Sequence, residues 1–370
     1  MKKYVFIEAF CGPGGMSLGL ERAGFKPGIA FDLDEWAVKT YRHNLPGECR
    51  VADARKVDPK ELLGKLSLRR GHLALVAGGP PCQGFSKQTR GAHLGDPRND
   101  LVTRYAELVH AILPRAFIFE NVAIFGQKRG RQYLRFMQAH LGEYALYPHF
   151  YNCADYGLAQ TRERFVVVGV RRDQQVQFSP PLPSVKRWRT VGEVLSGLPE
   201  PPEDYSVHPE FPNHQRARVT AINIQRFSHV PQGGGWRDVP EELRLPCHQA
   251  VDTSSGGWPD VYGRLEWNGQ CPTITGGFDS FTRGRYGHPL QDRPLTPREA
   301  ARLQGFPDDY EFLGTRGHQR SQIGNVVPPP LAEAIGREVL HCLRVADGLE
   351  KPRRGHRPVN ARLEAQPELF

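Results

Sequence analysis

The 370-residue sequence has no long apolar run and no closely spaced pair of cysteines. Crossing a bilayer takes about 20 consecutive apolar residues, so we expect no membrane span. The opening apolar run is short, contains Glu8 and leads straight into a glycine-rich turn, so we expect no signal peptide either. The seven cysteines are widely spaced and include no CxxC pair, which argues against a disulfide framework and a zinc site. These absences predict a cytoplasmic protein that needs no metal.

The overall composition is that of a soluble globular protein, with 39% hydrophobic and 24% charged residues. The 39 glycines and 32 prolines predict many turns and long ordered loops. The formal net charge is +9. A basic surface suggests a polyanionic partner such as nucleic acid, although many basic proteins bind nothing charged.

Short apolar runs alternate with amphipathic stretches from residue 4 to about residue 171. Continuous apolar strands separated by helices indicate an α/β fold with a parallel, Rossmann-like sheet and helices on both faces. Such a sheet binds ligands at the carboxyl ends of its strands. The predicted strands cover 4–9, 28–32, 73–78, 116–120 and 164–171, and the predicted helices cover 16–23, 35–43, 101–113 and 131–140.

The pattern of alternating apolar runs and amphipathic stretches stops in the middle of the chain and later resumes, which predicts a smaller domain inserted into the first. In the middle of the chain helical periodicity nearly vanishes, and arginines and aromatics are scattered among glycines. The first pattern then returns with two predicted helices, 296–304, which opens with a capping box of Thr296 and Glu299, and 331–343. The final segment is polar and basic, so we expect it to be disordered. The predicted parts are the main domain (1–178), the inserted domain (179–290), the segment returning to the main domain (291–345) and the tail (346–370).

A glycine-rich stretch, FCGPGG at 10–15, joins the first predicted strand to the first helix. Glycines there let the backbone turn sharply and approach a ligand, although a tight strand–helix turn also explains them. Asp32, after the next strand, could accept hydrogen bonds from both ribose hydroxyls of an adenosine, Asp53 could accept one from the adenine amino group, and Leu33 could pack on the base. Pro13 removes a backbone donor that a pyrophosphate would need, so a nucleoside without phosphate fits better than a dinucleotide.

Cys82 follows two prolines just after a predicted strand, in the stretch GGPPCQGFS. A cysteine is most often a small buried apolar residue, but these turn-forming neighbours predict a nucleophile on a rigid elbow. Glu120 follows the next predicted strand. A lone glutamate there is usually solvated or caps a helix. Here it would lie on the same edge of the sheet as Cys82, which makes both residues candidates for catalysis.

Six motifs follow one another along the chain: FCGPGG, PPCQGFS, the ENV that starts at Glu120, QTRER (160–164), RLQGFP (302–307) and GN-x-VPP (324–329). Their order resembles that of the DNA cytosine-5 methyltransferase family. The resemblance covers 4 to about 178 and about 290 to 343, and the middle segment corresponds to the family's variable target recognition domain. Two departures keep the physical function: Glu8 stands where the family more often has Asp, and Asp32-Leu33 stands where members often show Glu and an aromatic.

The resemblance implies transfer of a methyl group from S-adenosylmethionine to carbon 5 of cytosine, with S-adenosylhomocysteine as product and no metal. The thiolate of Cys82 would add to carbon 6, which makes carbon 5 nucleophilic enough to take the methyl group. Glu120 would hydrogen-bond nitrogen 3 and the exocyclic amino group, while Arg162 and Arg164 would hold the base and a phosphate. A base would then remove the carbon 5 proton, and Cys82 would leave.

The resemblance also assigns a cofactor pocket. Asn325 and Val327 would complete it, and the helix at 331–343 would pack beside the first strand, so that the C-terminal part of the chain supplies part of the fold. The implied cofactor-binding residues are Phe10, Gly12, Pro13, Gly15, Asp32, Leu33, Asp53, Ala54, Pro81, Leu101, Asn325 and Val327.

A cytosine in duplex DNA must be flipped out to reach such a pocket. The segment 83–99 resembles the family's mobile loop that closes over DNA, with Ser86 on the DNA and Gln88 in the gap left by the base; in the free protein it would be a solvated loop. Arginine can donate two hydrogen bonds to guanine, so glycine-flanked arginines in the middle segment predict a site that contains G·C pairs. For any one of them, phosphate contact or solvation is as good an explanation. These arginines are Arg237, Arg264, Arg283 and Arg285.

Three alternatives stay open. A tRNA cytosine-5 methyltransferase shares these motifs, but its middle domain is small, whereas this one spans 179–290. A catalytically inactive homologue is disfavoured because all four predicted catalytic residues are present. A nicotinamide-dependent oxidoreductase would explain only the glycine-rich stretch. The compact chain looks like a monomeric bacterial modification enzyme that protects duplex DNA beside a restriction endonuclease, and a solitary methyltransferase is the alternative.

Overall fold

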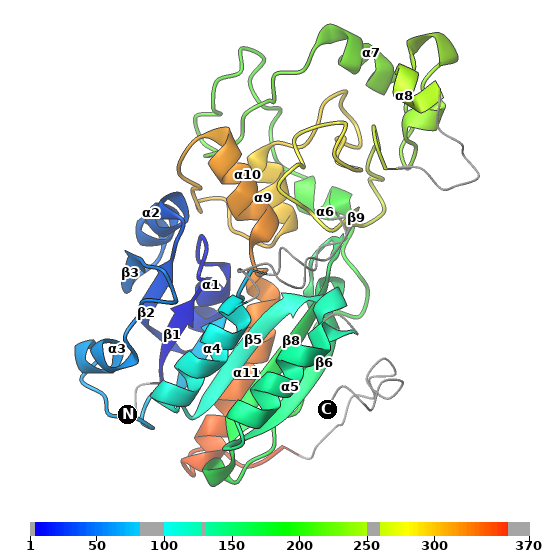
Figure 1. Cartoon of the computed structure of the whole chain (residues 1–370). Helices are drawn as coiled ribbons and strands as arrows, with labels where there is room; N and C mark the ends of the chain where they lie inside the picture. Colours follow the sequence, from blue (N-terminus) through cyan, green and yellow to red (C-terminus); the bar gives the residue numbers. More distant parts are fainter. Residues whose placement is uncertain (1–3, 82–99, 128–129, 250–259, 354–370) are drawn as a thin grey trace. The chain divides into compact units, whose positions relative to one another are not determined.

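The computed structural model describes residues 4–81, 100–127, 130–249 and 260–353. The chain forms two compact units, each assembled from separate stretches of sequence (Figure 1). Unit 1 comprises Met1–Tyr156, Glu163–Ser184 and Val327–Phe370, and unit 2 comprises Gly157–Arg162 and Val185–Val326.

The strands of unit 1 are β1 (Val5–Ala9), β2 (Lys26–Asp32), β3 (Glu48–Val51), β4 (Leu75–Gly78), β5 (Ala116–Val122), β6 (Tyr144–Asn152) and β8 (Glu163–Arg171). Within the described part of the chain, these seven form one sheet in the order β3-β2-β1-β4-β5-β8-β6. The neighbours from β3 to β5 pair in parallel, whereas β8 runs antiparallel to both β5 and β6. The sheet is therefore mixed, with one reversed strand near an edge.

The helices of unit 1 are α1 (Gly15–Ala23), α2 (Glu35–Asn44), α3 (Pro59–Lys65), α4 (Asp100–Ile112), α5 (Arg131–His140) and α11 (Pro329–Ala346). Figure 1 shows α4 and α5 in front of the sheet and α11 behind it, so both faces are covered. The buried residues of α4 include Leu101, Tyr105, Leu108 and Ile112, spaced as one face of a helix. That face packs on the apolar strands around Phe117. Among the described residues, no helix combines the length and apolarity that a membrane span needs.

The helix α11 completes unit 1 by packing against α1. The two helices approach closely because Gly19 has no side chain: a Cβ there would lie 2.4 Å from the carbonyl oxygen of Pro329. Nearby, the Tyr4 hydroxyl donates to Asp347 Oδ2 (2.9 Å), and Arg115 Nη2 lies 3.0 Å from Asp347 Oδ1. Residues that are more than 300 positions apart in the sequence therefore complete one fold.

The strands and helices predicted for the first part of the chain are confirmed, with ends that shift by at most two residues. The expectation of a wholly parallel sheet is wrong, because β8 is antiparallel to its neighbours. The sequence pattern also misses β3, β6 and α3. Of these, β6 is an edge strand that contains Pro148 and many partly exposed residues, so it shows no continuous apolar run.

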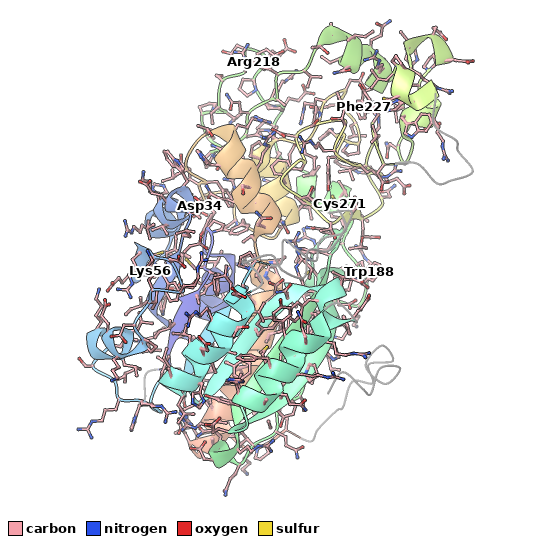
Figure 2. The ribbon with its side chains drawn as sticks, viewed as in Figure 1. Asp34, Lys56, Trp188, Arg218, Phe227 and Cys271 are labelled. Carbon is pink, nitrogen blue, oxygen red and sulfur yellow. The ribbon has the colours of Figure 1, made fainter. Side chains whose placement is uncertain are left out.

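Unit 2 has little regular structure among its described residues. An apolar cluster that includes Phe227, Trp236, Tyr262 and Phe281 forms part of its core, and Phe227 is labelled in Figure 2. The elements of unit 2 are β7 (Gln160–Thr161), β9 (Cys271–Pro272), α6 (Val191–Leu195), α7 (Ala221–Ser228), α8 (Pro246–Gln249), α9 (Pro297–Leu303) and α10 (Arg316–Asn325), with short 3-10 turns between them.

Buried arginines satisfy backbone carbonyls in these loops. The Arg298 guanidinium donates to the carbonyl oxygens of Pro212 (2.8 Å), Pro307 (2.9 Å) and Tyr310 (2.6 Å). Irregular backbone has no ladder of its own, and a buried carbonyl without a partner is costly. A guanidinium with five N–H donors can serve several carbonyls at once. Burial lowers the pKa of Arg298 to about 10, so the side chain stays charged at neutral pH.

The segment 291–326 belongs to unit 2, although its helical periodicity predicts a return to the main domain at 291. The predicted capping box is present at the start of α9, where Thr296 Oγ1 accepts from Glu299 N (3.2 Å) and Glu299 Oε2 accepts from Thr296 N (2.8 Å). Glu299 also pairs with Arg293 of the same unit (2.6 Å), and α9 packs against α6 and α10. Periodicity predicts a helix but does not show which unit the helix packs in.

Candidate active site at the edge of the sheet

The carboxyl ends of β1, β2, β4 and β5 lie at one edge of the sheet, because these strands are parallel. In register, Ala9 pairs with Gly78, and Gly78 pairs with Phe119. The antiparallel strand β8 starts at the same edge, where Arg164 pairs with Val122. Residues at these strand ends are therefore neighbours, at the edge where such sheets bind ligands.

Glu120 and Arg164 form a buried ion pair at this edge. Arg164 Nε lies 2.7 Å from Glu120 Oε1, and the two side chains are only 10% and 11% exposed. Arg164 Nη1 also donates to the carbonyl oxygen of Glu163 (2.8 Å), which sets the orientation of the guanidinium. Charge-assisted hydrogen bonds of this kind hold a carboxylate in one place as an acceptor. The structure thus brings together two of the four predicted catalytic residues.

The segment that follows β4 passes directly beside Glu120. A Cβ on Gly79 would lie 2.8 Å from Glu120 Oε2 and 3.7 Å from Val327 Cγ2, so a larger residue would displace the carboxylate. The Asn121 side chain donates to the carbonyl oxygen of Pro80 (3.2 Å) and ties the segment to β5. Gly79 and Asn121 lie inside the GGPPCQGFS and ENV stretches, but neither residue type indicates this role from the sequence alone.

The predicted nucleophile, Cys82, lies outside the described residues, as do Ser86 and Gln88. The preceding described residue is Pro81, which follows the anchored Pro80. The roles of Cys82, Ser86 and Gln88 therefore stay predictions. The structure describes only the segment that leads to Cys82, up to Pro81.

Asp32 organises the glycine-rich loop after β1. Its Oδ2 accepts from Gly12 N (2.8 Å) and its Oδ1 accepts from Asp34 N (2.9 Å), which links the loop to the start of α2 near Asp34 (Figure 2). Phe10 (φ 57°), Gly12 (φ 52°) and Gly14 (φ 97°) all have left-handed backbone. A Cβ on Gly12 would meet no atom within 4 Å, so the loop borders open space. Burial raises the pKa of Asp32, and the backbone hydrogen bonds oppose that rise.

The other predicted cofactor residues of this edge differ in exposure. Leu33 is 65% exposed directly beside Asp32, which leaves it available to pack on a base. The Asp53 carboxylate accepts from the backbone N and side-chain Nε of Arg55, both at 3.0 Å, and these bonds lower the pKa of Asp53. Leu101 is instead buried in α4. A carboxylate beside an exposed apolar side chain and an open loop suits a nucleoside, so these residues fit the predicted S-adenosylmethionine.

A second buried acid, Glu8, lies in β1 just before this loop. Its carboxyl group is hydrogen-bonded to the Ser17 hydroxyl, and the Tyr41 hydroxyl donates to Ser17 Oγ (2.9 Å). Burial raises the pKa of Glu8 to about 8, and repulsion from Asp32 adds to the rise. The sequence gives Glu8 as a charged residue in the opening apolar run and as a departure from the family motif, and neither observation predicts a buried network.

Arg162, the remaining predicted catalytic residue, is a structural brace of unit 2, which means that its guanidinium holds separate segments together through backbone carbonyl oxygens. Its Nη1 donates to the carbonyl oxygen of Ile274 (2.9 Å), and its Nη2 donates to those of Gly324 (3.1 Å) and Val326 (3.0 Å). The residue is 1% exposed. These bonds hold the end of α10 against the segment after β9, and a direct contact with substrate would require some of them to break.

Two of the four arginines predicted to contact DNA bases are also braces. All three guanidinium nitrogens of Arg264 donate to backbone carbonyls, with Nε to Val230 (2.6 Å), Nη1 to His288 (3.1 Å) and Nη2 to Phe227 (2.9 Å). Arg285 likewise donates to carbonyls of a neighbouring loop. Donors that already serve the backbone are not available to guanine, so these contacts argue against base recognition by either residue.

The other two arginines of that set are exposed. Arg237 lies at the surface with its guanidinium 5.6 Å from the centroid of the Trp236 ring, and Arg283 is exposed near Gly277. Base recognition by these two stays a prediction. The separation could not be made from the sequence, because glycine flanks both the buried and the exposed arginines.

Asn325 and Val327, the predicted completion of the cofactor pocket, fall in different units. Asn325 ends α10 in unit 2, where its Nδ2 lies 3.3 Å from Ser321 Oγ. Val327 begins the return to unit 1 and lies beside Gly79, at the sheet edge described above. The structure therefore places Val327 beside the segment that follows β4, and the cofactor-binding roles of Val327 and Asn325 stay predictions.

Comparisons with known proteins agree with this geometry. The family of C-5 cytosine-specific DNA methylases matches residues 4–341. Relatives include the type II methyltransferase M.BbvI of Brevibacillus brevis, 35% identical over 90% of each chain, and the type II methylase M.HgiDII of Herpetosiphon aurantiacus, 34% identical over 94% of this chain and 97% of that protein. A crystal structure of a putative DNA modification methyltransferase encoded within an E. coli prophage matches with a TM-score of 0.70 at 27% identity, covering 92% of this chain and all of that one.

Three observations now coincide: the motif order, the mixed sheet with its buried carboxylate at the ligand edge, and a family match over nearly the whole chain. Membership of this family implies S-adenosylmethionine as methyl donor and DNA as substrate. The chain belongs to the C-5 cytosine-specific DNA methylases and is a DNA (cytosine-5)-methyltransferase.

Proposed function

We propose that the chain methylates a flipped-out cytosine in one specific duplex sequence through a covalent bond between Cys82 and carbon 6. The Glu120–Arg164 pair carries this proposal, because it places an oriented carboxylate against the anchored segment that leads to Cys82. Preorganised groups of this kind stabilise charge that develops on a substrate without having to reorient.

Each residue has a separate task in the proposed reaction. Glu120 binds nitrogen 3 and the exocyclic amino group, which favours the protonated ring, and Arg164 keeps that carboxylate in place. The Cys82 thiolate attacks carbon 6, and the ring electrons shift to carbon 5. S-adenosylmethionine, when bound, supplies the methyl group from a positively charged sulfur. A base then takes the carbon 5 proton, and the bond to Cys82 breaks.

The cofactor would lie at the same edge. Asp32 would accept bonds from the ribose hydroxyls while it still holds the Gly12 amide, Leu33 would cover one face of the adenine, and Asp53 would accept from the adenine amino group. Pro13 and the left-handed loop around it leave room for a nucleoside and offer few donors for a pyrophosphate.

Mechanism-based trapping tests the proposal. A duplex with 5-fluorocytosine at the target position should form a stable covalent complex with the protein in the presence of S-adenosylmethionine, because fluorine cannot leave as a proton does. The complex is detected as a band that survives denaturing electrophoresis. Cys82→Ser should lose both trapping and transfer of tritiated methyl groups.

Cys247→Ser is the matched control, because Cys247 is an exposed free cysteine of unit 2. It should trap and methylate like the wild type. A covalent complex that persists in Cys82→Ser would contradict the assignment of the nucleophile. Methyl transfer to tRNA in preference to duplex DNA would contradict the assignment of the substrate.

The named relatives are type II methyltransferases of bacteria. We therefore propose that this chain is the modification enzyme of a type II restriction-modification system, acts as a monomer and works separately from its endonuclease. An endonuclease gene beside the methyltransferase gene is the expected observation, and a solitary gene would favour the solitary methyltransferase.

A further inference from the structure

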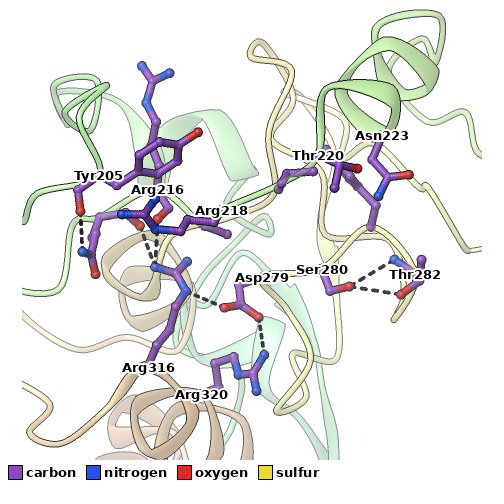
Figure 3. A pocket seen from close by; sticks show the side chains of 14 residues that line it. Tyr205, Arg216, Arg218, Thr220, Asn223, Asp279, Ser280, Thr282, Arg316 and Arg320 are labelled. Atoms are coloured by element: carbon purple, nitrogen blue, oxygen red, sulfur yellow. Dashed lines mark hydrogen bonds and ion pairs between the residues drawn. The ribbon is translucent and has the colours of Figure 1, made fainter.

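Unit 2 contains a cavity of about 590 Å³ that the motifs do not account for (Figure 3). Its wall combines the loop 215–220, the loop 279–282 and the exposed side of α10. Four of the lining residues are arginines and one is an acid. We call this site the arginine pocket and define it by Arg216, Arg218, Arg316, Arg320 and Asp279.

The charges of the arginine pocket are unbalanced. Asp279 is the single carboxylate among the described residues that line it. Glu200 and Glu203 approach Arg216 only from outside this lining, at 3.6 and 3.9 Å. The lining therefore holds four arginines against one carboxylate, and this excess of positive charge attracts anions.

Two of these arginines are held rigidly. Arg316 Nε donates to Asp279 Oδ2 (2.6 Å) and Arg320 Nη1 donates to Asp279 Oδ1 (3.0 Å), while Asp279 is only 3% exposed. Arg316 Nη1 also donates to the carbonyl oxygen of Gln215 (3.0 Å). Arg316 Nη2 and Arg320 Nε are buried and have no hydrogen-bond partner among the described residues.

Arg218 completes the pocket in a different way. Its guanidinium lies 4.7 Å above the centre of the Tyr205 ring, and it makes no ion pair within the described part of the chain. Figure 3 shows it on the same side of the pocket as Arg216 and Arg316. Stacking on an aromatic ring holds a guanidinium extended and leaves its N–H donors, which point outward in its plane, ready for a ligand.

We propose that the arginine pocket binds a backbone phosphate of the DNA duplex. Guanidinium groups match the oxygens of a phosphate, and the hydroxyls of Thr220, Ser280 and Thr282 in the same lining can add donors. The edge of a base offers donors as well as acceptors, but the one carboxylate here is already bound by two arginines. The pocket therefore suits an acceptor-only ligand.

This proposal rests on the proposed action on duplex DNA and adds a second, sequence-independent contact to it. A phosphate contact strengthens binding to every duplex equally and positions the protein on the DNA. It also makes binding more sensitive to salt, because each neutralised phosphate releases counterions. Sequence choice would remain with other residues of unit 2.

Equilibrium binding of the full-length chain at several salt concentrations tests the pocket. The probes are a duplex that the wild type methylates and a duplex that it does not. Arg218→Ala should weaken binding to both by the same factor, roughly tenfold, and should lower the slope of log K against log salt by about one. Arg218→Lys, which keeps the charge, should restore part of both effects.

Arg187→Ala is the matched control, because Arg187 is a 73% exposed arginine of unit 2 outside the pocket and paired with Glu193. It should change neither affinity nor slope. Wild-type affinity and slope in Arg218→Ala would overturn the proposal, and a loss confined to the methylated duplex would show base recognition instead. Methyl transfer by the wild type is measured in parallel. If the wild type transfers no methyl groups to duplex DNA, the proposed function is wrong. If it does, and Arg218→Ala keeps wild-type affinity and salt slope, only the phosphate-binding role of the arginine pocket is wrong.

Discussion

The buried carboxyl group of Glu8 couples pH to stability. It contacts the Ser17 hydroxyl, and its pKa rises from 4.5 to about 8 because it is buried. The folded protein therefore keeps a proton that the unfolded chain releases above pH 4.5. The stability linked to Glu8 is fully present below that pH, falls as the pH rises, and is lost above about pH 8.

We predict that Glu8→Gln flattens this dependence, because glutamine keeps a neutral polar group and cannot ionise. Between pH 5.5 and 7.5, the free energy of unfolding of the wild type should fall faster than that of Glu8→Gln by up to about 1.4 kcal/mol per pH unit. Urea unfolding at three pH values measures both slopes. Glu48→Gln removes an exposed acid and should follow the wild type. Equal slopes in wild type and Glu8→Gln would show that the pKa is not raised.

Residue types and motif order predict Glu120 and Arg164 as site residues, and the structure pairs them. The same reasoning cannot separate a brace from an exposed side chain. Arg264 and Arg283 both lie beside glycines, yet only the folded backbone shows that Arg264 donates to carbonyls. Gly79 also escapes prediction, because its importance comes from Glu120, which lies 41 positions further along the sequence.

At the scale of elements, the contact between α1 and α11 depends on a missing side chain. Gly19 lies in a helix, where glycine is less favourable than alanine by roughly 0.5–1 kcal/mol. Its Cβ position is only 2.4 Å from the carbonyl oxygen of Pro329. A backbone oxygen cannot rotate away like the end of a side chain, so the clash should outweigh the gain in helix propensity.

We predict that Gly19→Ala lowers the free energy of unfolding by about 1–3 kcal/mol because it overpacks the α1–α11 contact. Gly64→Ala is the matched control, since Gly64 is also helical, in α3, and its Cβ would meet no atom within 4 Å. It should raise stability by up to about 1 kcal/mol. Denaturant unfolding of the wild type and of both variants measures these changes in the free energy of unfolding. Equal, stabilising effects would mean that the two helices do not pack as closely as described.

Elements with strong periodic patterns are predicted well, and the missed ones have physical reasons. β3 has only four residues and includes Glu48 and Arg50, so it resembles a loop. β6 contains Pro148, which an edge strand tolerates because one of its sides needs no hydrogen bonds. The antiparallel direction of β8 follows from its pairing between β5 and β6, which is a long-range property that local sequence does not contain.

At the scale of the whole molecule, the arginines of unit 2 serve two purposes. Buried ones, such as Arg264 and Arg298, hold loops together through carbonyl oxygens. Exposed ones, such as Arg237 and Arg283, are available to a polyanion. The basic net charge that suggests nucleic acid therefore includes charges that stabilise the fold and cannot all contact DNA.

We predict that replacing a buried arginine changes the stability of the protein, whereas replacing an exposed one changes its choice of DNA site. Arg264→Ala leaves carbonyls without donors and Asp292 without its partner (2.5 Å), so it should destabilise the protein by about 3 kcal/mol or more. Arg283→Ala should leave the melting temperature unchanged and, if Arg283 contacts guanine, relax site preference at one position by about 1–3 kcal/mol. Thermal unfolding and sequencing of the methylated DNA measure the two effects. An Arg264→Ala protein with wild-type stability would contradict its role as a brace.

Because α11 packs on α1 and completes unit 1, unit 1 cannot finish folding on the ribosome until α11 has been synthesised. The face of α1 that carries Leu20 is synthesised long before α11, whose Gly336 lies against Leu20 in the folded unit. At about 5–20 residues per second, that face waits roughly 15 to 60 seconds while all of unit 2 is made. During that time the exposed apolar face favours aggregation of the unfinished chain, and a premature stop just before α11 would leave the face uncovered.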